Sequence, residues 1–245
     1  RPRRECFGEL VQMDTSIHDW LEGRGESMVL ILMIDDATSR VLMRFYGGDT
    51  TEANMDLIAR WIALHGRPGA LYVDYASHFR QLGRRGQRQG TRTRTQIERA
   101  LGEVHVKMIN AHSPQAKGRV ERAFRTLQDR LVMELRLRKV RTMEAANQYL
   151  EEEFIEWWQK RLNYTPACPV DAHRSAAGLD LDAIFCAHET RRPGRVAITK
   201  ADLSFIEIAV AIRVDAIVGE VLATVDDGRP DDGRGVLLKR CVECV

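Results

Sequence analysis

Short apolar runs separated by turn residues fill the first part of the chain, a pattern typical of strands. Leu10 to Met13 reads as a short strand that is closed by Asp14. Met28 to Ile34 is a nearly unbroken apolar run, as expected for a central strand covered on both faces. Val41 to Tyr46 is expected to be a third strand. Because the connections are short, the three strands are predicted to form an antiparallel meander.

A helical period follows this meander and then alternates with further strand signals. Apolar positions between Thr50 and Gly66 form one stripe at helical spacing. The next run, Ala70 to Val73, is expected to be a strand parallel to the strand that it joins, because the chain crosses over through a helix. The remaining predicted elements are helices over residues 97–101, from Gly118 to about Arg138 and over residues 143–161, and an edge strand from Val104 to Met108.

This order of elements predicts an α/β fold, with a ribonuclease-H-like mixed five-stranded sheet and flanking helices. Residues 181–186 are expected to form a short docking helix, and the Trp157-Trp158 pair is expected to pack rather than to stack on bases. After Arg192 the pattern changes to short β-like runs, which predict a small, mostly β C-terminal region. The expected domains are therefore a core over residues 1–190 and a β-rich domain over residues 191–245.

The segment Ser113-Pro-Gln-Ala-Lys-Gly-Arg-Val-Glu-Arg122 begins the most informative helix. Ser-Pro ends the preceding element, because a residue before proline is pushed out of the helical region. One stripe of the helix is apolar, and a second, polar stripe contains Lys117, Glu121, Arg125 and Gln128. Glu121 is thus a carboxylate among cations near a helix start. An alternative reading is that Glu121 only forms ion pairs with Lys117 and Arg125 on a solvated face.

Two other carboxylates stand at the ends of apolar runs, Asp14 and Asp74. A carboxylate just past a buried strand lies at the rim of a sheet, where sites are commonly built. Three carboxylates that converge there would bind hard divalent cations such as Mg²⁺ through oxygen. Asp35 and Asp36 close an apolar run in the same way and are rival ligands, although Asp is also favoured in turns.

These residues resemble the Asp-Asp-Glu catalytic core of retroviral-integrase-like transposases from bacterial insertion sequences, most of all the ISNCY type. The resemblance covers about residues 5–190, and the block around Glu121 is its most specific part. Further segments that resemble the family are Leu32-Met-Ile-Asp-Asp-Ala-Thr-Ser-Arg40, His18-Asp-Trp20 and Asp171-Ala-His-Arg174. The resemblance assigns the catalytic role to Asp14, Asp74 and Glu121 and leaves Asp35 and Asp36 to turn chemistry.

The resemblance implies a metal-dependent polynucleotidyl transferase. Asp14, Asp74 and Glu121 would hold two Mg²⁺ or Mn²⁺ ions, for hydrolysis at element ends followed by strand transfer of the freed 3′-hydroxyl into target DNA. Expected partners are double-stranded DNA, as element ends and target, and further copies of the chain, with no membrane. Two rivals remain open: a metal-dependent nuclease of the same fold, and a catalytically idle DNA-binding remnant or regulator.

Basic residues near the carboxylates are candidates for DNA contact. The arginine-rich stretch between Phe79 and Gln96 has almost no apolar residues and cannot bury a core, but closely spaced cations suit DNA phosphates. The loop before Gly118 and the helix after it supply the other candidates. The DNA-binding candidates are Arg84, Arg85, Arg88, His112, Gln115, Lys117, Arg119, Arg122 and Arg125.

Composition adds few further limits. The 245 residues are 44% hydrophobic and carry a net charge of +2, so overall charge does not announce nucleic-acid binding, and the local distribution matters more. Five scattered cysteines argue against a disulfide framework and for a reducing compartment, which agrees with a bacterial cytoplasmic, nucleoid-associated protein. No signal peptide is visible. The absence of an initiating Met indicates a fragment that lacks the N-terminal DNA-reading region usual in the resembling transposases.

Overall fold

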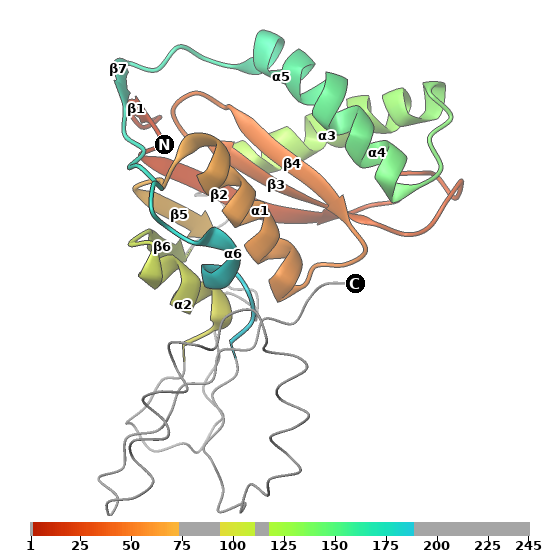
Figure 1. Cartoon of the computed structure of the whole chain (residues 1–245). Coiled ribbons are helices and arrows are strands. Elements are labelled where there is room, and N and C mark those ends of the chain that lie inside the picture. The colour runs from red at the N-terminus through yellow and green to blue at the C-terminus, as the bar shows by residue number, and fades with distance from the viewer. Residues whose placement is uncertain (1, 74–93, 111–117, 189–245) are drawn as a thin grey trace, which may run out of the picture. The chain divides into compact units, whose positions relative to one another are not determined.

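A five-stranded mixed sheet is the centre of the fold (Figure 1). The computed structural model describes residues 2–73, 94–110 and 118–188. The strand order is β4-β3-β2-β5-β6. Strands β2, β3 and β4 form the predicted antiparallel meander, and β5 and β6 join it in parallel. The bounds are β2 Leu10–Ile17, β3 Val29–Asp35, β4 Val41–Tyr46, β5 Ala70–Val73 and β6 Lys107–Asn110. The predicted ribonuclease-H-like sheet is confirmed.

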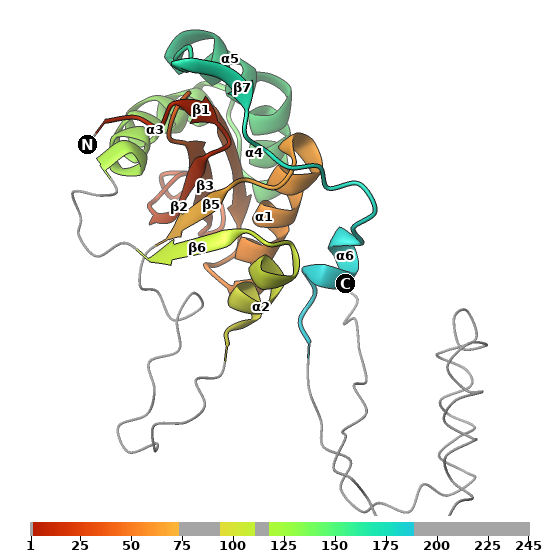
Figure 2. The ribbon, with the colours of Figure 1, turned by 90° about the vertical axis from the view of Figure 1, so that its left-hand side faces the viewer.

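Helices cover both faces of this sheet (Figures 1 and 2). On one face lie α1 (Thr51–His65) and α2 (Gln96–Glu103). The other face is covered by α3 (Gly118–Leu137) and by a helical stretch made of α4 (Met143–Tyr149), the π-helical turn η2 (Leu150–Phe154) and α5 (Ile155–Leu162). The predicted single helix over residues 143–161 is therefore continuous in space but contains a π-helical turn.

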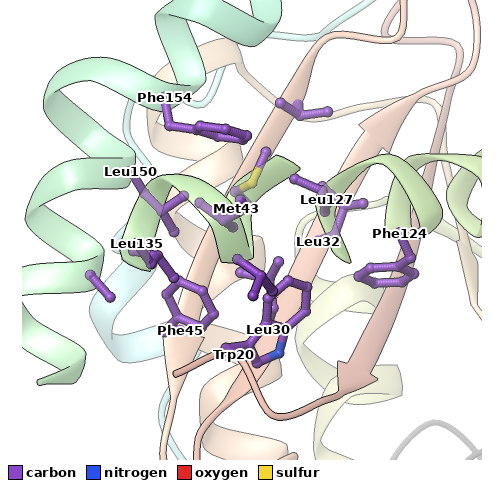
Figure 3. Packing of buried hydrophobic residues seen from close by; sticks show 14 of the residues in the cluster. Trp20, Leu30, Leu32, Met43, Phe45, Phe124, Leu127, Leu135, Leu150 and Phe154 are labelled. Carbon is purple, nitrogen blue, oxygen red and sulfur yellow. The ribbon is translucent and has the colours of Figure 1, made fainter. Parts of the chain in front are cut away.

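The two layers form because β3 alternates its side chains between them. Leu30, Leu32 and Ile34 pack on the α3 side, and the intervening residues pack on the α1 side. Figure 3 shows Leu30 and Leu32 among aromatic and aliphatic side chains of β4, α3 and the η2 turn. Each fully buried large apolar side chain contributes about 1.5–3 kcal/mol to stability. Strand β3 is therefore buried between two apolar cores. A shift of its pairing by one residue would exchange the two sets of side chains, so this packing fixes the register of the sheet.

Clear caps explain why α1 was predictable to within a residue. The Thr50 side chain accepts a hydrogen bond from the Ala53 N–H, which satisfies a donor of the first turn. The helix ends at Gly66, which has a φ of 95°. A Cβ at this position would approach the Arg174 carbonyl oxygen to 2.7 Å, so both the backbone conformation and the space favour glycine.

Two predicted boundaries were wrong. Strand β2 continues to Ile17, so Asp14 lies within the strand rather than just past it, because the register with β3 holds from Val11 to Ile17 despite the polar residues. Strand β6 begins at Lys107 rather than at Val104. Residue Val104 caps α2 instead, and its side chain is buried in the core of the α1 side.

The two ends of the described core are joined by a small second sheet. Strand β1 (Cys6–Phe7) pairs in parallel with β7 (Cys168–Asp171). The predicted docking helix is present as α6 (Leu181–Ile184). Trp158 is buried and donates a hydrogen bond from Nε1 to the Ser39 carbonyl at 3.1 Å, which confirms a packing role for this side of the Trp157-Trp158 pair.

Several predictions fall on residues outside the described ranges. These include the small β-rich region over residues 191–245 and with it the division of the chain near residue 190. Both remain predictions. Within the described ranges, no helix is long and apolar enough to cross a membrane.

Candidate active site

Asp14 lies in the middle of the central strand β2 and points toward α3. Its neighbour Met13 packs in the core on the α1 side, and successive strand residues face opposite ways. The antiparallel partner of Asp14 is Leu32, which belongs to the core on the α3 side. The side chain of Asp14 is half-buried. A carboxylate is thus presented at the face of the sheet that α3 covers.

Glu121 lies in the first turn of α3, on the flank of this helix that borders β2. Gln128 is seven residues further on and therefore lies on the same face of the helix. The Gln128 Nε2 donates a hydrogen bond to Ser16 Oγ at 3.2 Å. Ser16 is two residues from Asp14 and points to the same side of β2. The Glu121 flank of α3 therefore borders the polar face of β2 that carries Asp14.

Contacts at the start of α3 fix the direction of this helix over the strand. Arg119 donates from Nε to the Asp36 carbonyl at 3.2 Å, and the same Nε lies 3.4 Å from Asp36 Oδ1. Asp36 is held at the first residues of β2, because its N–H donates to the Leu10 carbonyl and its Oδ1 accepts from Gln12 Nε2. Helix α3 and strand β2 thus run in the same direction. Along the helix, Glu121 lies between the contacts of Arg119 and Gln128, and along the strand, Asp14 lies between those of Gln12 and Ser16.

Arg119 has a partner inside the protein. Its side chain is only 9% exposed, and the Asp36 side chain that it contacts is fully buried. Arg122 and Arg125 are exposed on the same helix, and Arg122 donates from Nε to the Gly118 carbonyl at 2.9 Å. Of the three candidate DNA-binding arginines on α3, Arg119 is therefore built into the fold, whereas the other two face solvent.

Asp35 and Asp36 occupy the turn after β3. The Asp35 carboxylate accepts hydrogen bonds from the Gly8 N–H at 3.0 Å and from the Thr38 N–H and hydroxyl at 2.8 and 2.7 Å. Burial nevertheless raises the pKa of Asp35, against the effect of these hydrogen bonds. Asp36 accepts from the Arg4 N–H at 2.8 Å. The Asp35 carboxylate thus satisfies donors of the turn, as the turn reading expects, whereas the Asp36 carboxylate binds donors outside the turn, on the N-terminal segment, β2 and α3.

The alternative reading of Glu121 as an ion-pair residue finds no support in the described ranges. Glu121 is exposed and has no hydrogen-bond or ion-pair partner among the described residues. Arg125, four residues later, likewise has no carboxylate partner there. Its other suggested partner, Lys117, lies outside the described ranges. His18, in the segment after β2 that resembles the family, is exposed and packs edge-on against Trp20 with ring centroids 5.2 Å apart.

The third carboxylate of the predicted set, Asp74, lies outside the described residues. Strand β5 ends at Val73, one residue before Asp74, and its register pairs Tyr72 with Gln12 of β2. Within the described residues, no group of three or more His, Cys, Asp or Glu side chains could hold a metal ion. The predicted site residues outside the described ranges are Asp74, Arg84, Arg85, Arg88, His112, Gln115 and Lys117.

Two residues near Asp14 and the end of β5 were not predicted as part of the site. Gln128 connects α3 to β2. The sequence signal that could have identified it is its position seven residues after Glu121, on the same face of the helix. Asn110 ends β6 opposite Val73, and its Oδ1 is buried with no hydrogen-bond partner in the described part of the chain. An amide oxygen here adds an acceptor beside the end of β5.

The sheet order and the two helix layers define a ribonuclease-H-like α/β domain with carboxylates on β2 and α3. Among solved structures, the fold is similar to a chain of the simian T-cell lymphotropic virus intasome in complex with PP2A regulatory subunit B56 gamma. It has a TM-score of 0.51 and 16% identity, and covers 81% of this chain and 63% of that chain. The HTLV-2 integrase catalytic core domain in complex with magnesium has a TM-score of 0.48 and 15% identity, over 68% of this chain and 96% of that chain.

Sequence comparison identifies relatives that are transposases. The chain is 39% identical over 197 residues to a protein of Sinorhizobium fredii named as a transposase, y4bF, covering 79% of this chain and 42% of the relative. It is 35% identical over 151 residues to the transposase for insertion sequence IS1202 of Streptococcus pneumoniae, covering 61% of this chain and 32% of the relative. No family model matches the chain. The chain is thus a homologue of insertion-sequence transposases and spans less than half the length of these relatives.

Proposed function

We propose that the chain is the catalytic core of an Asp-Asp-Glu transposase, with Asp14, Asp74 and Glu121 as its catalytic residues. The observation that carries the proposal is the pairing of Gln128 with Ser16 at 3.2 Å, which sets the Glu121 flank of α3 along the Asp14 face of β2. Asp74 directly follows β5, the strand next to β2. The homology to transposases supports the same assignment.

The donor set suits hard divalent cations. Asp14 and Glu121 offer carboxylate oxygens, and Asp74 would supply a third, which is the ligand chemistry that Mg²⁺ and Mn²⁺ prefer. These residues would hold two ions, which when bound supply activation of the attacking oxygen and stabilisation of the leaving oxygen. Asp14 is held rigidly by pairing within the central strand, whereas Glu121 is on a helix anchored by Arg119 and Gln128.

The proposed reaction is phosphodiester hydrolysis at the ends of an element, followed by attack of the freed 3′-hydroxyl on target DNA. The exposed Arg122 and Arg125 on α3 and the candidates His112, Gln115 and Lys117 before it would bind DNA phosphates and orient the strand. Arg84, Arg85 and Arg88 would extend this contact. Since Arg119 is paired with Asp36, its role here is to position the helix. Assembly of several copies on paired DNA ends is part of the proposal.

A strand-transfer assay tests this function. The full chain is incubated with pre-cut DNA ends, a target plasmid and Mg²⁺ or Mn²⁺, and compared with Asp14→Asn and Glu121→Gln. The matched control is Glu144→Gln, which changes an exposed carboxylate in the first turn of another helix, α4. Joined products that are lost with Asp14→Asn and Glu121→Gln but kept with Glu144→Gln would support the proposal. Cleavage without joining would identify a nuclease, and DNA binding without any reaction would identify an idle binder.

Metal binding is tested separately from chemistry. An ion that binds only the native protein stabilises it, by about 2.7 kcal/mol at a concentration of 100 times the dissociation constant. Added Mg²⁺ or Mn²⁺ is therefore expected to raise the melting temperature of the unsubstituted chain and of Glu144→Gln. The same addition should leave the double variant Asp14→Asn/Glu121→Gln unchanged. An equal rise in all three proteins would contradict the assignment of these ligands.

A further inference from the structure

The flank of α3 that faces away from Glu121 borders a groove. Pocket residues of α3 on this side are Arg122, Thr126 and Arg130, which recur every four residues and form one strip. A hollow of about 190 Å³ and another of about 460 Å³ share Thr126 and Leu162 in their linings, so they are continuous. Both α3 and α5 lie on the same face of the sheet (Figures 1 and 2). The α3–α5 groove is lined by Arg122, Thr126, Arg130, Trp157, Arg161 and Leu162.

The arginines of the α3–α5 groove are not neutralised by carboxylates. Arg130 and Arg161 are exposed, and among the described residues neither has an ion-pair partner. Arg161 instead lies over the ring of Trp157, with 6.0 Å between its guanidinium carbon and the ring centroid. The cationic lining is therefore available to an anion.

Three carboxylates near the groove are paired with other cations. Glu134 and Glu153 both bind Arg138, the latter at 2.7 Å, and Glu156 binds Lys160. They reduce the positive potential around the groove without forming ion pairs with its arginines. Some arginines of other faces are paired, as Arg60 is with Asp56 at 2.8 Å, whereas others, such as Arg125 and Arg141, have no carboxylate partner among the described residues. What distinguishes the groove is that two such exposed arginines, Arg130 and Arg161, line one hollow.

The spacing of these cations suits the backbone of a nucleic acid. Arg122 and Arg130 are eight positions apart, which is about 12 Å along a helix that rises 1.5 Å per residue. One strand of duplex DNA rises about 3.4 Å per nucleotide, so this distance corresponds to three or four nucleotides. The ring of Trp157 attracts the Arg161 guanidinium that lies over it, which helps to hold this cation at one wall of the groove.

We propose that the α3–α5 groove binds the phosphate backbone of a duplex DNA segment away from the reacting phosphate. The reason for separating the two is geometric: the groove strip and Glu121 lie on opposite flanks of α3, on either side of its buried stripe. A transferase that joins two DNA molecules must hold more duplex than its carboxylates touch. The inference rests on the proposed function only in taking DNA as the substrate.

The test measures duplex binding as a function of salt concentration. The full chain is titrated against a fluorescein-labelled 30-base-pair duplex of random sequence, in EDTA, and anisotropy gives the affinity. Each phosphate contact contributes about 0.9 to the slope of log affinity against log salt, so Arg130→Gln/Arg161→Gln is expected to reduce the slope by about 1.8. The matched control, Arg60→Gln/Arg141→Gln, removes the same charge from α1 and from the segment after α3 and should keep the slope.

Two further variants keep the inference falsifiable if the glutamine pair folds poorly. Arg130→Lys/Arg161→Lys retains the charge and should retain the slope. Thr126→Glu leaves all groove arginines in place, adds a carboxylate between them and should reduce the slope. The proposal would be overturned if the slope fell equally in the groove and control pairs, or if it stayed unchanged in the groove pair. It would also be overturned if the chain did not bind the duplex, or if unlabelled RNA displaced the labelled duplex more effectively than unlabelled duplex does.

The outcomes separate this inference from the catalytic proposal. Glu121→Gln is expected to abolish strand transfer and to leave the groove-dependent part of the salt slope in place. If the groove and control variants had equal salt slopes and the chain still performed metal-dependent strand transfer, the proposal of DNA binding by the groove would be refuted and the catalytic proposal would stand. A slope difference without any strand transfer would refute the catalytic proposal alone.

Discussion

Gln128 of α3 donates a hydrogen bond from Nε2 to Ser16 Oγ of β2, over a distance of 3.2 Å and a sequence separation of 112 residues. It joins the helix that carries Glu121 to the strand that carries Asp14. The apolar stripe of α3 fixes the helix on the sheet, but such a stripe alone allows the helix to rotate slightly or slide. A polar contact on the Glu121 flank fixes the rotation of the helix.

Gln128→Leu should therefore reduce activity more than stability. The loss of one hydrogen bond destabilises the fold by about 1 kcal/mol, because a partly exposed pair exchanges its partner for water. Misplacement of Glu121 should lower the strand-transfer rate about tenfold or more, since small displacements of catalytic groups have large effects on rate. Urea denaturation and single-turnover strand transfer measure the two effects.

Ser16→Ala provides the matched change on the other side of this contact. If Gln128 acts through Ser16, the double variant should lose little more activity than either single variant. Fully additive losses would show that Gln128 influences the reaction by another route, such as direct contact with DNA.

Substitution by alanine is expected to affect mainly the stability of the fold at Arg119 and mainly DNA binding at Arg122. Arg119→Ala removes the partner of a fully buried Asp36 carboxylate and should destabilise the fold by about 3 kcal/mol. Arg122→Ala changes an exposed side chain and should shift stability by no more than about 0.5 kcal/mol, while it weakens duplex binding. Thermal or urea denaturation and anisotropy titrations measure both quantities. A stable Arg119→Ala protein with weakened DNA binding would restore Arg119 as a DNA contact.

Local signals explain which parts of the fold could be predicted. Val41–Tyr46, Thr51–His65 and the long helix from Gly118 all have clear periodicity with caps or turn residues at their ends, and their predicted bounds agree with the structure to within about one residue. Strand β2 was predicted too short because Asp14 and the two polar residues after it ended the apolar run. Pairing with β3 carries the strand on to Ile17, and this is a tertiary effect.

The candidate site was predictable only in its residue types. The segment around Glu121 pointed to a carboxylate on a helix. Asp14 was chosen because it closed an apolar run and because the family resemblance selected it over Asp35 and Asp36, and the extended β2 removes the first of these reasons. What supports Asp14 instead is the side of the sheet to which it points, and this depends on register. The contacts of Gln128 and Arg119 join residues more than 80 positions apart, and no local pattern specifies such pairs.

Asn147 protects the free edge of the sheet. Strand β4 is the terminal strand, and the Phe45 N–H donates to Asn147 Oδ1 at 2.7 Å while Asn147 Nδ2 donates to the Phe45 carbonyl at 3.0 Å. Asn147→Ala should destabilise the fold by about 2 kcal/mol, because two bonds are lost and two edge groups are left without a partner. Exposure of this edge should also increase concentration-dependent association. Urea denaturation and light scattering measure these effects.

The neighbouring Gln148 supplies the control for this prediction. Its side chain is exposed and donates to Glu152 at 3.0 Å. Gln148→Ala should change the free energy of unfolding by about 0.5 kcal/mol or less. A loss of the same size in both variants would show that the helix itself, rather than the edge of β4, accounts for the effect of Asn147.

His65 should make the protein less stable in mild acid. Burial, followed by the charges of His173 and Arg40, lowers the pKa of His65 from 6.5 to about 4. Its Nε2 is buried and has no hydrogen-bond partner in the described part of the chain. As the pH falls below 6.5, the unfolded chain binds a proton at His65 that the native protein does not bind until about pH 4. The resulting loss of stability is confined to the range from pH 6.5 to pH 4, and stability is fully retained above it.

His65→Phe keeps a ring at this position, where His65 packs on Phe7 with centroids 5.3 Å apart, and removes the titrating group. Urea denaturation at pH 7, 6, 5 and 4.5 should show a steeper fall in the free energy of unfolding for the unsubstituted chain than for His65→Phe. The exposed His18 serves as the comparison, and His18→Phe should follow the unsubstituted chain. Parallel curves for His65→Phe and the unsubstituted chain would mean that other groups determine the acid sensitivity, because every other titrating residue is common to both proteins.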